Sequence, residues 1–225
     1  MLKLYYNPGS CSLASHAALE EAGLPYETEL VDLTQNVQFS EDYRRKNPWG
    51  RVPALLIGQD VLTENVAILN YIAGLVPERE LLPKAGLAHA RAIEWLSLLS
   101  STVHVAFRPI FRPNRIAETE SGQKDVAATG LNSLKSVLSL LDQRLGEGPY
   151  ALGDRFSLCD LYLFVFVLWS RRPMLDGKLG ALPNLDAFAE RLAAALRSAL
   201  PGSGGACMAE GAQNGLSCIA RPKPR

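Results

Sequence analysis

The spacing of apolar and polar residues predicts a mixed first part of the chain. Residues 2–6 (LKLYY) alternate and are rich in β-forming residues, which predicts a strand. Apolar residues recur at helical spacing from 12 to 22, and the sequence Gly23-Leu24-Pro25 is typical of a helix end. The same reasoning predicts strands at 26–32, 52–57 and within 59–64, a helical turn around 40–46 and a helix at 65–75. This order of elements indicates an α/β layer built on a small mixed sheet.

A helical pattern follows the proline-containing connector VPERELLPKAG at 76–86. We predict helices at 87–108, 126–145, 157–170 and 184–199. The third is apolar on nearly every side, as is typical of a helix at the centre of a bundle, and it begins with a capping-box pattern of Ser157 and Asp160. The second half is therefore predicted to be all-α. Residues 201–225 are rich in Gly, Ser and Pro without periodicity, and we expect a flexible tail there.

Charge and composition narrow the choice of partners. The 225 residues carry 23 Lys plus Arg and 23 Asp plus Glu, so net charge gives no reason to expect nucleic acid or an anionic membrane. The first residues lack the pattern of a secretory signal, and the longest apolar run, 161–169, is too short to span a bilayer. We therefore expect a soluble, cytoplasmic protein with no nucleic-acid or membrane partner.

The cysteines give no sign of a metal site. None has CxxC spacing or a histidine at metal-ligand offsets, and in a reducing cytosol we expect free thiols. Cys159 lies inside the apolar run and is interpreted as a core residue, whereas Cys207 and Cys218 fall in the predicted tail.

Cys11 lies where the loop after the first strand enters the first helix. The first N–H groups of a helix have no intrahelical partners, so they can donate to a thiolate and, with the helix dipole, lower the pKa of the thiol. Inert packing of a small residue is the alternative. Ala14 stands where a dithiol motif has its second cysteine, so an oxidised Cys11 would pair with an external thiol such as glutathione.

Two further loops carry groups suited to a ligand. The Val52-Pro53 bond at a strand entrance is a candidate cis peptide, which would leave the Val52 backbone free for an extended ligand. Glu64 directly precedes a helix and could receive an ammonium group, while Asn65 could act as the N-cap. An ordinary capped helix is the alternative for Asn65. The three loops fall at edges of one small sheet, which favours a shared site.

A polar strip follows one face of the predicted helix at 87–108. Its members are spaced at helical offsets opposite an apolar side, and small polar groups suit a cleft or a close subunit contact. His104 could polarise a bound thiol or carboxylate near neutral pH, although a lone surface histidine is the alternative. The strip consists of Ser97, Ser100, Ser101, His104 and Arg108.

Five segments in this order resemble the cytosolic glutathione transferases, and the segment around Cys11 is most similar to the bacterial beta class. They are LYYNPGSCSLASH, NPWGRVPALL, LTENVAILNYIA, IEWLSLLSSTVH and SLCDLYLF, and the similarity runs over about residues 1–200. The resemblance implies a thioredoxin-like, glutathione-binding domain at 1–80, a linker at 81–87, and an all-helical domain at 88–200 with the co-substrate pocket. It also implies a homodimer.

The resemblance assigns roles residue by residue. Cys11 and His104 match residues close to the glutathione sulfur, and Cys11 matches one that can form a mixed disulfide with it. The capping box Ser157/Asp160 matches a folding element that carries no chemistry. The implied glutathione-binding residues are Tyr6, Ser10, Asn36, Val52, Pro53, Glu64, Asn65, Ser97, Ser101 and Thr102.

Three functions follow from this resemblance. The first is a glutathione transferase that joins the glutathione thiolate to electrophilic, mostly apolar small molecules. The second is a glutathione-dependent thiol-disulfide oxidoreductase using Cys11, and the third is a non-catalytic ligand-binding member of the fold. Three arginines, Arg108, Arg112 and Arg115, lie beside the expected pocket mouth. They could be ordinary solvated side chains, could compensate for a lysine that family members have, or could favour an acidic co-substrate.

Overall fold

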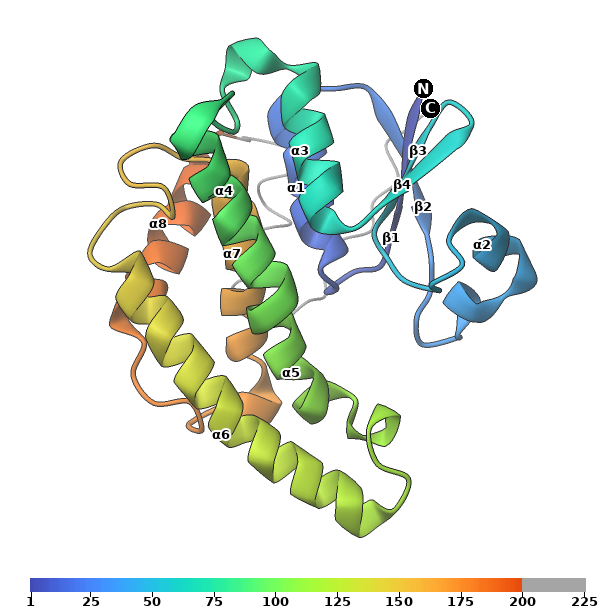
Figure 1. Ribbon diagram of the computed structural model, residues 1–225, viewed down its shortest axis with the longest axis vertical. Coiled ribbons are helices and arrows are strands. Elements are labelled where there is room, and N and C mark those ends of the chain that lie inside the picture. The colour runs from blue at the N-terminus through green and yellow to red at the C-terminus, as the bar shows by residue number, and fades with distance from the viewer. Residues whose placement is uncertain (200–225) are drawn as a thin grey trace.

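The computed structural model describes residues 1–199 and confirms the predicted α/β part followed by a helical part (Figure 1). The first part contains β1 (Leu2–Tyr6), α1 (Ser12–Ala22), β2 (Tyr26–Leu30), α2 (Glu41–Lys46), β3 (Ala54–Ile57), β4 (Asp60–Thr63) and α3 (Asn65–Leu75). The second contains α4 (Gly86–Leu98), α5 (His104–Phe111), α6 (Glu120–Leu145), α7 (Leu158–Ser170) and α8 (Pro183–Ala199). The predicted tail at 201–225, with Cys207 and Cys218, lies outside the described residues.

The strands form one mixed sheet in the order β2-β1-β3-β4. β1 pairs with β2 in parallel and with β3 antiparallel, and β3 pairs with β4 antiparallel. Because side chains alternate along β1, Leu4 and Tyr6 pack in the cluster that includes α1, while Tyr5 packs with Tyr43 of α2. The sheet is thus covered on both faces, by α1 and α3 on one side and by α2 on the other (Figure 1).

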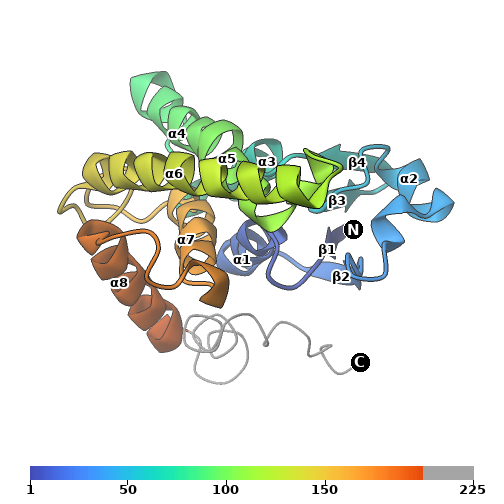
Figure 2. The same ribbon diagram turned by 90° about the horizontal axis from the view of Figure 1, so that it is seen from below.

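A single core connects the two parts of the chain. α1 packs against both α3 and α7, and its small residues Ala14 and Ala18 are fully buried, which lets the helices approach closely. Every residue of α7 from Leu158 to Trp169 is buried, as the apolar pattern predicted. Figure 2 shows α7 between α1 and α8, with α6 crossing the front of the helical part.

The start of α7 has the predicted capping box. Asp160, fully buried, accepts hydrogen bonds from the backbone N–H of Ser157 at 2.7 Å and from that of Ala151 at 2.7 Å. The Ser157 hydroxyl donates to the same carboxylate at 3.0 Å. The carboxylate therefore ties the loop before α7 to the helix.

Two helices differ from their predicted limits. α6 begins at Glu120, six residues before the predicted start of 126, because its first turn is polar and is fixed by Thr119, whose hydroxyl accepts from the N–H of Gly122 at 3.1 Å. The helix predicted at 87–108 extends from Gly86 to Phe111, and a π-helical turn at Leu99–Val103 divides it into α4 and α5. In the described part of the chain no helix is long and apolar enough to cross a membrane.

Helices α5 and α6 cross at a buried glycine. A Cβ on Gly130 would fall far inside van der Waals contact with Cβ of Pro109. Pro109 lies within α5, one residue after Arg108. The absence of a side chain at Gly130 therefore sets the position of α5 against α6.

Candidate active site at the junction of the two parts

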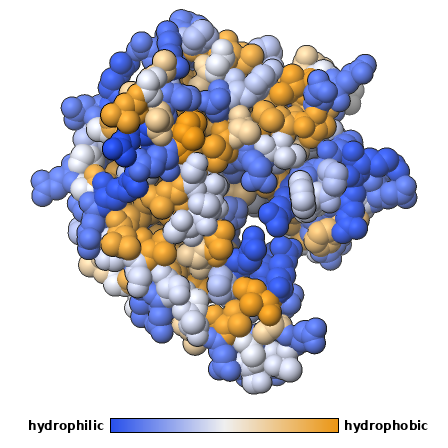
Figure 3. All heavy atoms as spheres, in the orientation of Figure 1, coloured by the Kyte–Doolittle hydropathy of each residue, from blue (hydrophilic) through white to orange (hydrophobic). Residues whose placement is uncertain are grey.

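A cavity of about 150 Å³ lies where the sheet domain meets the π-helical turn and α5. Figure 3 shows a hollow on this face, bordered largely by hydrophilic residues. The lining comes from the loop before α1, the loop before β3, the end of β4, the start of α3, the junction of α4 and α5, and α7. The lining residues are Cys11, Asn47, Arg51, Val52, Pro53, Thr63, Glu64, Asn65, Ser100, His104, Val105, Arg108 and Tyr162.

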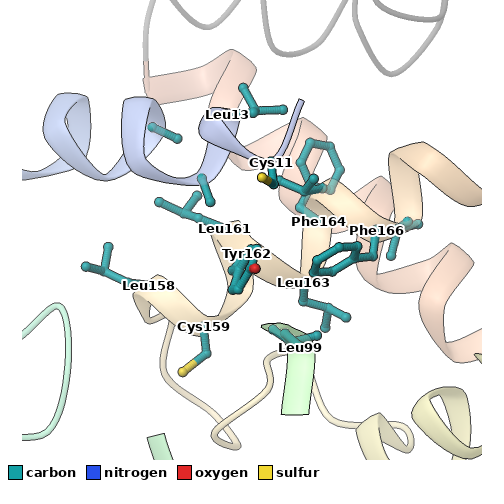
Figure 4. Packing of buried hydrophobic residues seen from close by; sticks show 14 of the residues in the cluster. Cys11, Leu13, Leu99, Leu158, Cys159, Leu161, Tyr162, Leu163, Phe164 and Phe166 are labelled. Atoms are coloured by element: carbon teal, nitrogen blue, oxygen red, sulfur yellow. The ribbon is translucent and has the colours of Figure 1, made fainter. Parts of the chain in front are cut away.

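Cys11 is at the N-cap of α1, but its surroundings favour the thiol and not the thiolate. Its Sγ lies 3.5 Å from the carbonyl oxygen of Val52 and donates to it, a hydrogen bond that requires the proton. Only 8% of the residue is exposed, and Figure 4 shows it among the packed side chains of Leu161, Tyr162 and Phe164 of α7. Burial raises the pKa of Cys11 to about 12, against smaller opposing effects of its own backbone N–H and of Asn65. The predicted lowering of this pKa is therefore wrong.

A further reason, besides burial, lies in the first turn of α1. The N–H of Ser12 donates to the Ser10 hydroxyl at 3.2 Å, and the N–H of Leu13 donates to the Ser10 carbonyl at 3.2 Å. The next N–H, of Ala14, donates to the carbonyl of Cys11 at 3.2 Å. The groups that were expected to stabilise a thiolate are thus used locally.

Asn65 holds the Cys11 loop instead of capping α3. Its Nδ2 donates to the Cys11 carbonyl at 3.1 Å, and its Oδ1 accepts from the Ser15 hydroxyl at 2.6 Å. The N-cap position is occupied by Glu64, which has a positive φ of 68°, so the predicted N-cap role of Asn65 is wrong. Asn65 is buried, whereas Glu64 is exposed and contributes a carboxylate to the cavity.

The predicted cis peptide between Val52 and Pro53 is confirmed. The residue before it, Arg51, has a firmly held backbone, because its carbonyl accepts from the Tyr43 hydroxyl at 2.6 Å and from Nδ2 of Asn47 at 2.8 Å. The guanidinium of Arg51 is exposed at the cavity. This loop thus presents a fixed backbone and one positive charge.

The π-helical turn divides the predicted polar strip. The extra residue in such a turn rotates the positions before it relative to those after it. Ser100, His104 and Arg108 line the cavity, whereas Ser97 and Ser101 do not and are joined to each other through a 2.7 Å bond from the Ser101 hydroxyl to the Ser97 carbonyl.

His104 is a neutral imidazole. Its ring packs against Phe166 and Trp169, with centroids 5.6 and 5.1 Å away. Burial lowers the pKa of His104 to about 4, and the charges of Arg108 and Arg51 act in the same direction. His104 is thus uncharged at neutral pH and can polarise a ligand only as a neutral hydrogen-bonding group.

The helical part holds the Cys11 loop from the other side. The carbonyl of Gly9 accepts from the indole N–H of Trp169 at 3.0 Å and from the guanidinium of Arg172 at 2.7 Å. Arg172 in turn lies over the ring of Phe111, 4.6 Å from its centroid. The position of Cys11 therefore depends on α7 as well as on the sheet.

Six residues expected at the site do not line the cavity: Tyr6, Ser10, Asn36, Ser97, Ser101 and Thr102. Tyr6 is 9% exposed and packs in the core beside His16, and Ser10 is bonded within its own loop, its hydroxyl donating to the Asn7 carbonyl at 2.8 Å. Asn36 is exposed in a left-handed conformation before a 3₁₀ turn. Thr102 is exposed on the π-helical turn. The cavity unites the other six: Cys11, Val52, Pro53, Glu64, Asn65 and His104.

Five lining residues are not among those expected from the sequence: Asn47, Arg51, Thr63, Val105 and Tyr162. Asn47 and Arg51 stand within the quoted segment NPWGRVPALL, so their nearness to the Val52-Pro53 bend was an available signal. Thr63 immediately precedes Glu64. Tyr162 was hidden in the apolar run of α7, and only the packing shows that this residue reaches the cavity beside Cys11. Within residues 1–199 no group of His, Cys, Asp or Glu is arranged to hold a metal ion.

Comparison with known proteins defines the family. The family model described as glutathione S-transferase, N-terminal domain, matches residues 1–74, and that for the C-terminal domain matches residues 98–195. Glutathione S-transferase GstA of Escherichia coli O157:H7 is 36% identical over 195 residues, which is 85% of this chain and 92% of that protein. The chain therefore belongs to the glutathione S-transferase family.

Solved structures show which class of the family this chain resembles. The bacterial beta-class glutathione S-transferase of Sphingomonas chungbukensis is 34% identical, with a TM-score of 0.76 over 93% of this chain and 98% of that one. A glutathione transferase homologue from Sulfitobacter, solved with bound glutathione, is 36% identical, with a TM-score of 0.78 over 88% of this chain and 98% of the other. Among the cytosolic members of the family, this chain is beta-like.

Proposed function

We propose that this protein is a glutathione transferase, with glutathione as co-substrate and a small, mostly apolar electrophile as second substrate. The observation that carries the proposal is the meeting of Cys11, the Val52-Pro53 bend, Glu64 and His104 around one cavity between the two parts of the chain. Two relatives that support it are the Sulfitobacter homologue and a sphingomonad glutathione S-transferase, which is 35% identical with a TM-score of 0.76, both solved with glutathione.

The cavity offers a distinct group for each part of the tripeptide. The backbone of Val52 can pair with the cysteinyl unit, as an extended peptide pairs with a strand edge. The carboxylate of Glu64 can receive the γ-glutamyl ammonium, and the guanidinium of Arg51 can receive a carboxylate. The residues Tyr6, Ser10, Asn36, Ser97, Ser101 and Thr102 do not line the cavity, so their roles in glutathione binding stay predictions.

The chemistry is an attack by sulfur on carbon. The glutathione thiol loses its proton to solvent, the thiolate sulfur forms a bond to the electrophilic carbon, and the leaving group departs with its electron pair. The positive charges of Arg51 and Arg108 favour the thiolate over the thiol. A protonated Cys11 can turn its S–H from the Val52 carbonyl to the glutathione sulfur and stabilise the same thiolate.

The protonation state of Cys11 distinguishes the transferase function from the oxidoreductase function. Thiol-disulfide exchange by Cys11 needs its thiolate, which a pKa of about 12 makes scarce at neutral pH. The structure therefore favours a Cys11 that donates a hydrogen bond over one that exchanges disulfides.

The test compares wild type, Cys11→Ala and Cys159→Ala in two assays. Cys159 is a suitable control because it is fully buried on α7 and does not line the cavity. We expect wild type to conjugate 1-chloro-2,4-dinitrobenzene to glutathione. Cys11→Ala should retain conjugation with a rate lower by about tenfold, because it loses one weak hydrogen bond of about 1 kcal/mol. Loss of mixed-disulfide reduction alone in Cys11→Ala would assign the oxidoreductase role to Cys11. Failure of wild type to bind immobilised glutathione would refute both enzymatic functions and leave the non-catalytic one.

The homodimer and the cytoplasmic location belong to the same proposal. Ser101 and Thr102 are exposed on the π-helical turn, where a second subunit could cover them. Light scattering coupled to size-exclusion chromatography tests the dimer, for which the mass should be twice that of the 24.5 kDa chain.

A further inference from the structure

Four arginines gather beside the cavity, and the part of the chain that the structure describes gives none of them a counter-ion. Arg51 and Arg108 line it, and Arg112 and Arg115 follow at the end of α5. Within residues 1–199 their side chains have no hydrogen-bond or ion-pair partner. Other arginines of the chain do have carboxylate partners in the structure, namely Arg45, Arg91, Arg144, Arg155 and Arg171.

The four charges are close enough to influence one another. Burial lowers the pKa of Arg115, and the charges of Arg112, Arg108 and Arg51 lower it further. The chain as a whole has equal numbers of acidic and basic residues, so this positive region is a local excess. A cleft lined by charges of one sign attracts ligands of the opposite sign.

The arginines are divided between the two parts of the chain. Arg51 belongs to the loop before β3, on the side of Val52 and Glu64, where glutathione is proposed to bind. Arg108, Arg112 and Arg115 belong to the helical part, and Arg108 shares the lining of the cavity with Arg51. Apolar side chains accompany them, since Val105 lines the cavity and is 44% exposed and Ile116 is 51% exposed.

We propose that the second substrate is an apolar molecule carrying an anionic group, a carboxylate or a sulfonate, which Arg108 binds with the support of Arg112 and Arg115. This inference rests on the proposed transferase function and names the substrate class for it. The apolar body would lie against Val105, while the anion takes the place of the missing counter-ion. A guanidinium suits such a group because it donates two parallel hydrogen bonds to two oxygens.

The test uses two aryl chlorides of similar size and shape, of which 4-chloro-3,5-dinitrobenzoate is an anion and 4-chloro-3,5-dinitrobenzamide is neutral. In both, the glutathione thiolate forms a C–S bond at the ring carbon that bears chlorine, and the C–Cl bond breaks to release chloride. The two rings differ in intrinsic reactivity, so each kcat/KM is divided by the uncatalysed rate constant with glutathione at the same pH. The resulting ratio of benzoate to benzamide is the selectivity of the enzyme.

We expect wild type to favour the benzoate by about tenfold, the typical effect of one hydrogen-bonded charge pair at a partly exposed site. Arg108→Gln should reduce this selectivity to about one to two, mainly through KM for the benzoate. The control Arg91→Gln alters an exposed arginine on α4 that pairs with Glu94 and does not line the cavity, and it should leave the selectivity unchanged. Added salt should lower the selectivity of wild type, because the charges are exposed.

Glutathione is itself an anion, so its KM is measured in the same variants. A rise in KM for glutathione in Arg108→Gln, with the selectivity unchanged, would assign this arginine to glutathione and overturn the proposal. Equal normalised rates for benzoate and benzamide in wild type would also overturn it.

A binding measurement keeps the test independent of turnover. The glutathione conjugates of the two compounds are made chemically, and their Kd values are measured by calorimetry. If the carboxylate conjugate binds more tightly than the carboxamide conjugate, and Arg108→Gln removes this difference, the anion site is supported. This holds even if the enzyme turns over neither chloride. The lack of turnover would then refute the transferase activity alone. Equal Kd values overturn the anion site.

Discussion

Native Cys11 should resist alkylation, and the structure sets the size of the effect. At about pH 7.5 a thiol of pKa about 12 is ionised in about three molecules per hundred thousand, whereas an ordinary cysteine of pKa about 8.5 is about one-tenth ionised. The thiolate population of Cys11 is thus lower by about 3,000-fold. A more basic thiolate is also the better nucleophile, and a Brønsted slope of about 0.4–0.5 recovers about 40-fold of this deficit. The net expectation is a reaction slower by about two orders of magnitude.

The assay follows the Cys11 peptide by mass spectrometry after timed exposure to iodoacetamide. The same peptide in urea-unfolded protein is the reference, so the sequence and the reagent are matched. Mapping by peptide also separates Cys11 from Cys159, Cys207 and Cys218. Because the folded pKa is raised, the native rate should climb about tenfold per pH unit across the alkaline range.

Equal rates for folded and unfolded chains near neutral pH would refute this reasoning. That result would mean that the S–H bond to the Val52 carbonyl does not persist in solution and that Cys11 is available as a thiolate. The oxidoreductase function would then regain support.

Three other predictions concern the helical part and its junction with the site. In an NMR titration His104 should change protonation near pH 4. Because its pKa in the folded protein lies below the unfolded value of 6.5, its contribution to stability is complete above pH 6.5 and is lost as the pH falls toward 4. Asp160→Asn should lower the free energy of unfolding in urea by about 3 kcal/mol, because an amide NH₂ would face N–H donors that now bond to a carboxylate. Gly130→Ala should lower it by about 1–2 kcal/mol, since overpacking against Pro109 exceeds the gain in helix propensity.

Each of these has a matched control. The chain has three histidines, and His104→Asn identifies which of their signals belongs to His104. Asp154→Asn changes an exposed aspartate in the loop before α7 and should have little effect, so an equal loss in both variants would speak against the capping box. Gly74→Ala in α3 meets open space and should stabilise by up to about 1 kcal/mol. A Gly130→Ala protein as stable as wild type would show that α5 and α6 can separate without cost.

Most of the secondary structure was predictable because its signals are local. β1 and α1 have the predicted limits, 2–6 and 12–22, since alternation, helical spacing and the Gly23 end all agree. The start of α6 could not be found from apolar spacing, because its first turn buries no apolar side chain and is held by Thr119.

The site was only partly predictable because its protonation states and orientations depend on tertiary contacts. A cysteine at a helix start suggests a thiolate, but the distant carbonyl of Val52 and the burial under α7 reverse the direction of the pKa shift. Likewise, a regular helix would keep Ser97 and Ser101 beside His104, whereas the π-helical turn removes them from the cavity. Neither the burial of Cys11 nor the π-helical turn can be predicted from the local spacing of residues in the sequence.

The buried position of α1 between α3 and α7 has a consequence for the chain as an evolutionary unit. Two family models match the two parts separately, yet the fully buried residues Ala14 and Ala18 belong to a core that both parts build. Either part expressed alone would expose that surface to water. The exposed connector around Pro77–Arg79 thus links two parts that do not fold independently. A protease cut in this connector should leave two fragments that stay associated until they are denatured. Exchanging one part with that of a relative would therefore require α1 and α7 to change as a pair.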